Sequence, residues 1–221
     1  MAVAFRGVAP SILSADFARL GAQVQEVLDA GASTIHVDIM DGHFVPPITM
    51  GPLVVDALAE IVHGAGGVID VHMMVDEPAK HFSAVAKAGG DSVTFHYEAV
   101  DDVAATIRAA REQDLQVGIA FNPETEPEQV AAVADGVDLV LCMGIHPGYS
   151  GQPFREETYD RVRELRRLLP KEIPIQVDGG VFDANIRELH QRGATLFVAA
   201  SAIFGDEDLP RAYRRLVQVL A

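Results

Sequence analysis

Short apolar segments and stretches of helical periodicity alternate eight times along this chain. The apolar segments have the length of buried strands, and glycine, proline and acidic residues mark the ends of the helical stretches. Strands that alternate with helices are joined by right-handed crossovers, which make the strands parallel. Eight such units within 221 residues predict an α/β fold, a single (β/α)8 or TIM barrel with parallel strands.

We expect the strands over residues 8–13, 34–40, 68–74, 92–96, 116–121, 137–143, 173–177 and 196–199. Helices are expected over residues 17–30, 51–63, 78–88, 101–113, 127–134, 156–169, 184–192 and 209–220, with a short extra helix at 201–204. An open doubly wound sheet is the alternative, but the Gly-x-Gly-x-x-Gly turn of its dinucleotide-binding form does not follow the first strand. We find no composition break or low-complexity linker, so we expect one catalytic domain over residues 1–221.

Charge and composition exclude several classes of function. The formal net charge is −15, whereas nucleic acids and anionic membranes require a basic footprint. No apolar run approaches the length of a membrane-spanning helix, and Met1 to Pro10 lacks the apolar core of a signal peptide, so we expect a cytoplasmic protein. Cys142 is the single cysteine, which excludes an internal disulfide and indicates a buried, inert thiol.

Imidazole and carboxylate groups occur where the expected strands end. His36, Asp38 and Met40 share one face of the second strand, because side chains alternate along a strand. His72 lies in the third strand and Asp178 follows the seventh, and the active sites of such barrels lie at the carboxyl ends of the strands. Each histidine taken singly is more often a core or surface residue. Together, two imidazoles and two carboxylates favour a divalent metal site for Zn, Mn, Fe or Co.

Three turns after neighbouring strands suggest a phosphate site. An acidic protein must bind phosphate locally, through backbone N–H groups and helix N-termini. Loop geometry alone explains any one of these turns, but barrels of this kind often bind phosphate after strands seven and eight. The turn residues are Gly148, Tyr149, Ser150, Gly151, Gly179, Gly180, Ala200 and Ser201.

Three methionines also lie at strand ends: Met40, Met74 and Met143. They are either ordinary core residues or an apolar wall that shields a reactive intermediate from water.

Six segments carry a resemblance to a known family. They are residues 9–17 (APSILSADF), 36–46 (HVDIMDGHFVP), 70–75 (DVHMMV), 147–152 (PGYSGQ), 177–180 (VDGG) and 201–204 (SAIF). Through these segments the chain resembles the ribulose-phosphate 3-epimerase family over nearly its whole length and in the family's order. The first two segments together with VDGG are highly specific.

The resemblance implies an isomerase that interconverts D-ribulose 5-phosphate and D-xylulose 5-phosphate through an enediolate. It implies one divalent metal ion, zinc in first place with iron, manganese or cobalt as alternatives, bound by His36, Asp38, His72 and Asp178. Asp38 and Asp178 would be the acid/base pair, Ser11 and His72 would contact the sugar, and the three turns would hold the phosphate. The resemblance also implies a homo-oligomer.

Four positions depart from the family's usual residues: Pro47, His146, Ser150 and Ala200. Because Ser150 and Ala200 add side chains where glycine is usual, a 3-epimerase of another ketose phosphate, such as D-allulose 6-phosphate, is the nearest alternative. A related decarboxylase pattern, Asp-x-Lys-x-x-Asp, would need lysine where the chain has Met40. A non-catalytic sugar-phosphate-binding barrel is the third alternative, but it would need neither carboxylate.

Overall fold

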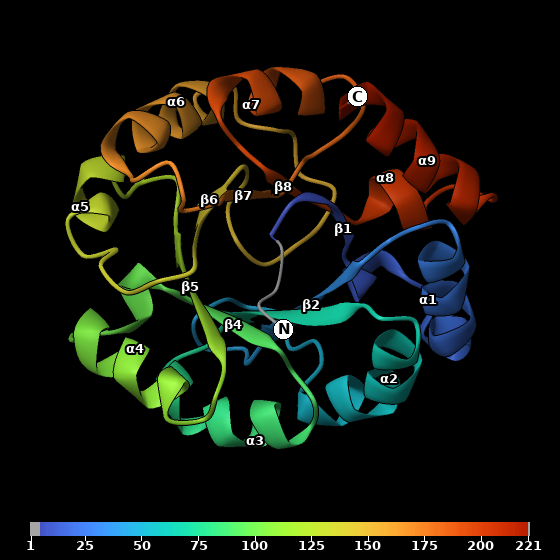
Figure 1. The fold of residues 1–221 in the computed structure, drawn as a ribbon, viewed down its shortest axis with the longest axis horizontal. Helices are drawn as coiled ribbons and strands as arrows, with labels where there is room; N and C mark the ends of the chain where they lie inside the picture. The colour runs from blue at the N-terminus through green and yellow to red at the C-terminus, as the bar shows by residue number, and fades with distance from the viewer. Residues whose placement is uncertain (1–4, 221) are drawn as a thin grey trace.

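Eight parallel strands form a ring at the centre of the molecule, which we describe from a computed structural model covering residues 5–220 (Figure 1). The strands are β1 (Gly7–Pro10), β2 (Thr34–Met40), β3 (Val68–Met74), β4 (Ser92–His96), β5 (Gln116–Phe121), β6 (Leu139–Met143), β7 (Ile175–Asp178) and β8 (Leu196–Ala199). Each pairs with the next from β2 to β8, and β8 pairs with β1. A single parallel bridge between Ser11 and His36 joins β1 to β2, so the expected (β/α)8 barrel is confirmed.

The helices surround the strands as an outer ring. They are α1 (Leu20–Asp29), α2 (Pro52–Gly64), α3 (Phe82–Lys87), α4 (Val103–Arg111), α5 (Pro127–Ala131), α6 (Thr158–Leu168), α7 (Ile186–Arg192), α8 (Ser201–Phe204) and α9 (Leu209–Leu220). Short 3-10 turns occupy Ile12–Ser14, Phe17–Arg19, Pro78–Lys80 and Tyr97–Ala99. Among the helices of residues 5–220, none has the length and apolar character needed to cross a membrane. The limits of the expected domain, residues 1 and 221, lie outside the described residues. The same holds for the first four residues of the segment from Met1 to Pro10, in which no signal peptide was expected.

Several helices begin later than the sequence pattern predicts, and local side chains explain where. Helix α4 begins at Val103 rather than at residue 101 because the Asp102 side chain accepts the N–H of Ala105, an N-cap bond. The expected helix over 78–88 splits into a 3-10 turn and α3 after Glu77, which has a φ of 51°. An N-cap side chain and a left-handed backbone residue therefore set boundaries that hydrophobic periodicity alone places only approximately.

Side chains along each strand point alternately to the apolar core beneath the outer helices and to the interior of the barrel. Val37, Ile39, Val71 and Met73 belong to the main apolar core, which also contains buried residues of the outer helices. Their neighbours in sequence point into the barrel, and β2 is buried on both faces along its whole length. The chain thus places its polar strand residues inside a closed ring.

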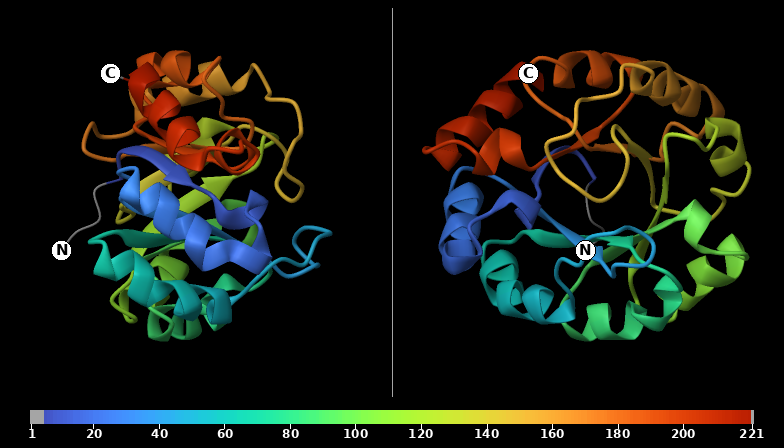
Figure 2. Two further views of the ribbon diagram at one scale, coloured as in Figure 1. Left: turned by 90° about the vertical axis from the view of Figure 1, so that its right-hand side faces the viewer. Right: turned by 180° about the vertical axis from the view of Figure 1, so that it is seen from behind.

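Two long loops project from the same end of the barrel, after β2 and after β6 (Figure 2). They come together at Gly148, where an added Cβ would lie 3.6 Å from Pro47 Cδ. Gly148 has a φ of +123°, a conformation that favours glycine. These loops lie at the carboxyl ends of the strands, where the site was expected.

Candidate functional site

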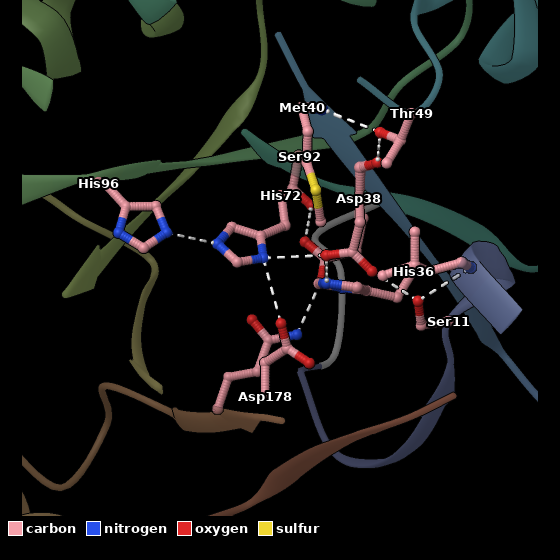
Figure 3. A network of polar contacts seen from close by, with 12 residues as sticks. Ser11, His36, Asp38, Met40, Thr49, His72, Ser92, His96 and Asp178 are labelled. Carbon is pink, nitrogen blue, oxygen red and sulfur yellow. Dashed lines mark hydrogen bonds and ion pairs between the residues drawn. The ribbon is translucent and has the colours of Figure 1, made fainter. Parts of the chain in front are cut away.

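Four side chains from three strands form a compact cluster inside this end of the barrel. They are His36 and Asp38 of β2, His72 of β3 and Asp178 of β7 (Figure 3). Each offers one ligand atom, and the four atoms all lie within 4.8 Å of one another. The structure therefore brings together the four residues that the sequence predicted as metal ligands.

The end of β2 is held in place by its own loop. Thr49 donates its hydroxyl to the Asp38 carbonyl and accepts the backbone N–H of Met40. The side chain of Asp41 accepts the backbone N–H groups of Phe44 and Asp76. Asp41 therefore acts as a turn residue after the end of β2.

His36 has two chemically different ring nitrogens. Its Nδ1 lies 2.8 Å from Asp70 Oδ2, and because a carboxylate only accepts, the imidazole donates. Its Nε2 lies 3.3 Å from Asp38 Oδ1 but has no hydrogen-bond partner, although it is buried. In the neutral ring this buried Nε2 would present a lone pair to the carboxylate cluster, an arrangement that fits a bound cation.

His72 is oriented by a second histidine. Its Nε2 lies 2.8 Å from Nε2 of His96, whose Nδ1 lies 3.4 Å from Glu98 Oε2. Burial lowers the pKa of His96 to about 4, so this ring is neutral and keeps its proton on the side of Glu98. His72 then donates through Nε2, and its Nδ1 lies 3.1 Å from Asp38 Oδ1 and 3.2 Å from Asp178 Oδ2. Burial opposes ionisation of His72, but Asp178 and Asp38 outweigh it and raise the pKa of His72, so without a cation Nδ1 carries a proton.

The histidine and aspartate side chains of the cluster influence one another's charge. Burial opposes ionisation of His36, but the carboxylates of Asp38 and Asp70 outweigh it and raise the pKa of His36. Burial likewise opposes ionisation of Asp38, but His36 and His72 hold its pKa below the usual range. The protein alone therefore favours a proton on imidazole between the carboxylates, which is where a divalent cation could replace it.

A cavity of about 550 Å³, including its mouth, opens above the cluster. Asp38 and Asp178 line it, whereas His36 and His72 are fully buried and do not. The expectation that His72 contacts the sugar stays a prediction. The other expected substrate residues all line this cavity: Ser11, Met40, Met74, Met143, Gly148, Tyr149, Ser150, Gly151, Gly179, Gly180, Ala200 and Ser201.

Several apolar and amide side chains in the same wall were not predicted from the sequence. They are Leu13, Ile145, Gln152, Val181, Phe182 and Val198. Gln152 donates to the carbonyls of His146 and Tyr149 and thereby fastens the loop after β6. Such residues have no pattern of their own, since only the folded loop brings them to the cavity.

Three other titratable residues lie outside the four-residue cluster. His43 is exposed in a loop, and His63 lies on the surface of α2, where it pairs with Asp91. Cys142 is fully buried, and burial raises the pKa of its thiol to about 11.

Comparison with known proteins decides the family. The sequence profile of the ribulose-phosphate 3 epimerase family matches residues 7–204. Ribulose-phosphate 3-epimerase of Bacillus subtilis is 42% identical over 93% of this chain and 95% of its own length. The Escherichia coli K12 protein of the same name is 41% identical over 97% and 96%. The chain belongs to the ribulose-phosphate 3 epimerase family.

This member of the epimerase family is an isomerase. Similarity extends to the chloroplastic ribulose-5-phosphate-3-epimerase of Arabidopsis thaliana, at 42% identity over 94% of this chain and 74% of that protein. Among solved structures, 3-hexulose-6-phosphate synthase superposes with a TM-score of 0.75 at 21% identity, covering 97% of this chain and 100% of that one. At that identity the superposition supports the barrel fold alone.

Proposed function

We propose that this chain is a metal-dependent ribulose-phosphate 3-epimerase, which interconverts D-ribulose 5-phosphate and D-xylulose 5-phosphate through an enediolate. The observation that carries the proposal is the placement of Asp38 and Asp178. Both line one cavity, and both lie within 3.2 Å of His72 Nδ1, yet they come from strands that are not neighbours in the ring. We further propose that residues 1–221 act as one catalytic domain and assemble as a homo-oligomer.

Inversion at C3 requires a proton to leave one face of the carbon and another to arrive on the opposite face. Asp38 is held ionised by its imidazole neighbours, and its Oδ2 accepts the Ser11 hydroxyl at 2.6 Å. It is therefore oriented to accept a proton from one side, while Asp178 delivers a proton from the other. In the reverse direction the two carboxylates exchange roles, and each is expected to contribute roughly 10²–10⁴-fold to the rate.

His36, Asp38, His72 and Asp178 would hold the metal, and the unpaired Nε2 of His36 supports this set. When bound, a divalent cation would supply Lewis-acid stabilisation of the negative charge that develops on substrate oxygens. The mixed imidazole and carboxylate set suits zinc, with iron, manganese and cobalt as alternatives.

Backbone groups would hold the phosphate. The described residues that line the cavity include no lysine or arginine, so an anion there would be bound by backbone N–H groups and uncharged side chains such as the Ser201 hydroxyl. Glycine at position 179 lets the turn after β7 pack closely against the loop after β6, because a Cβ there would lie 2.3 Å from Ile145 Cγ1. Tyr149, which is 64% exposed, stands at the rim where substrate enters.

The test is the ratio of kcat/KM for D-ribulose 5-phosphate and D-allulose 6-phosphate, measured with protein supplied with each candidate metal. The hexulose phosphate is included because Ser150 and Ala200, two departures from the family pattern, both line the cavity. We expect a clear preference for the pentulose phosphate. A preference for the hexulose phosphate would establish the alternative epimerase, and no turnover of either sugar would leave a sugar-phosphate-binding barrel.

A further inference from the structure

Asp70 is a fully buried carboxylate that neither lines the cavity nor belongs to the four-residue cluster. It lies on β3, two residues before His72, and is paired in strand register with His36 of β2. Burial of a charged carboxylate costs several kcal/mol unless its oxygens are well paired. A group this costly in the barrel interior calls for a specific role.

Three donors from three different strands surround this carboxylate. Its Oδ2 accepts from His36 Nδ1 at 2.8 Å and from the Gln176 amide at 2.8 Å, and its Oδ1 accepts the Ser92 hydroxyl at 2.6 Å. Within residues 5–220, His36 is the only cationic partner that the geometry gives it. The arrangement thus fixes Asp70 as an acceptor and directs it at one ring nitrogen.

The other nitrogen of that ring faces the cluster. Since Asp70 holds a proton on Nδ1 of His36, the lone pair of the neutral ring, the form that can bind a cation, lies on Nε2, the buried atom without a hydrogen-bond partner beside Asp38. A carboxylate behind an imidazole fixes its tautomer, limits rotation of the ring and increases the basicity of the free nitrogen. His72 differs from His36, because its second ring nitrogen, Nε2, contacts the neutral imidazole of His96 and not a carboxylate.

We propose that Asp70 is a positioning residue that locks His36 with Nε2 toward the cluster and thereby tightens the binding of a divalent cation. This inference rests on the proposed metal site and adds to it a residue outside the ligand set. The alternative is a purely structural role, in which Asp70 only ties β2, β4 and β7 together. The two roles predict different results for metal affinity in folded protein.

The test is titration of metal-free protein with Co²⁺, followed by its visible absorption and by competition with a chelator. Asp70→Asn keeps the volume and can keep the hydrogen bonds, but it removes the charge. Loss of such a supporting carboxylate typically weakens metal binding 10–100-fold, and we expect this loss together with an altered Co²⁺ spectrum. Folding of the variant is checked by circular dichroism.

Two control variants distinguish the positioning role of Asp70 from a purely structural role. Asp91→Asn makes the same substitution in another aspartate–histidine pair, that with His63 on the surface. Ser92→Ala removes one strand-tying hydrogen bond to Asp70 but keeps its charge. Both should bind Co²⁺ within about threefold of the wild-type affinity, by comparison with the loss expected for a supporting carboxylate.

Wild-type affinity in folded Asp70→Asn would overturn the role of Asp70. Failure of the wild-type protein to bind Co²⁺ would instead overturn the metal site itself. A second measurement uses only the wild-type chain, so it tests the proposed role of Asp70 even if Asp70→Asn does not fold. In ¹⁵N spectra of the Zn²⁺-loaded protein, His36 should carry its proton on Nδ1, and a proton on Nε2 would contradict the proposal.

Discussion

At the scale of single residues, Asp38 and Asp178 carry the proposed chemistry. Replacing either by asparagine keeps the shape of the side chain but removes its ability to take up a proton. We expect each variant to lose about 10²–10⁴-fold in kcat and to retain the far-ultraviolet circular dichroism of the wild type. Asp56→Asn, an exposed position on α2, is the control for loss of one charge. Turnover near the wild-type rate in a folded variant would remove that carboxylate from the mechanism.

Cys142 gives a prediction about pH at the same scale. Burial raises the pKa of its thiol to about 11, so the thiolate, which is the reactive form, increases only as the pH rises toward that value. In native protein we expect negligible alkylation at pH 8 and labelling that becomes fast when urea unfolds the chain. Rapid labelling of the folded protein at pH 8 would show that the thiol is not buried as described.

At the scale of elements, the turn after β7 is the most constrained connection in the site. Gly179 has a φ of +100° and its Cβ position is blocked by Ile145, whereas Gly31 has a φ of +108° with nothing within 4 Å. Both glycine-to-alanine variants carry backbone strain, but only Gly179→Ala also overpacks. We expect it to be roughly 1–3 kcal/mol less stable than Gly31→Ala, as measured by urea denaturation. Equal stability would mean that the turn can move away from Ile145.

The sequence predicted the strands better than the connections between them. The bounds of β2, β3, β4, β5 and β8 agree with the prediction, because each is a short run rich in β-branched and other apolar residues. Strand β1 ends at Pro10 rather than at residue 13 because Ser11 accepts the N–H of Leu13 and starts a 3-10 turn. Such a bond depends on local side-chain geometry that periodicity does not contain.

Within the site, too, some residues were predictable from the sequence and others were not. The residues at strand ends were predictable, because parallel strands bring their carboxyl ends together. The supporting residues Asp70, His96 and Glu98 were given no role, since their function depends on which ring nitrogen they contact. One signal was present for Asp70, which shares its strand face with His72 two residues later.

At the scale of the whole molecule, the proposed metal joins three strands of the barrel and should stabilise the fold. A ligand that binds only folded protein adds about 2.7 kcal/mol when its free concentration is about 100 times Kd. We therefore expect Tm to rise by several degrees with Zn²⁺ or Co²⁺ and to fall again with a chelator. His36→Ala should abolish the shift, while the exposed His43→Ala should keep it. An unchanged Tm in the wild type at saturating metal would argue against the site.

If two carboxylates act on opposite faces of one carbon, the hydrogen at C3 of the substrate should exchange with solvent during epimerisation. The protein is incubated with D-ribulose 5-phosphate in deuterated water, and C3 is followed by NMR from the first turnovers. With two acid/base groups, the carboxylate that delivers the new proton has exchanged with solvent, so the earliest D-xylulose 5-phosphate should carry deuterium at C3. Early product that retains the substrate's own hydrogen at C3 would contradict the account.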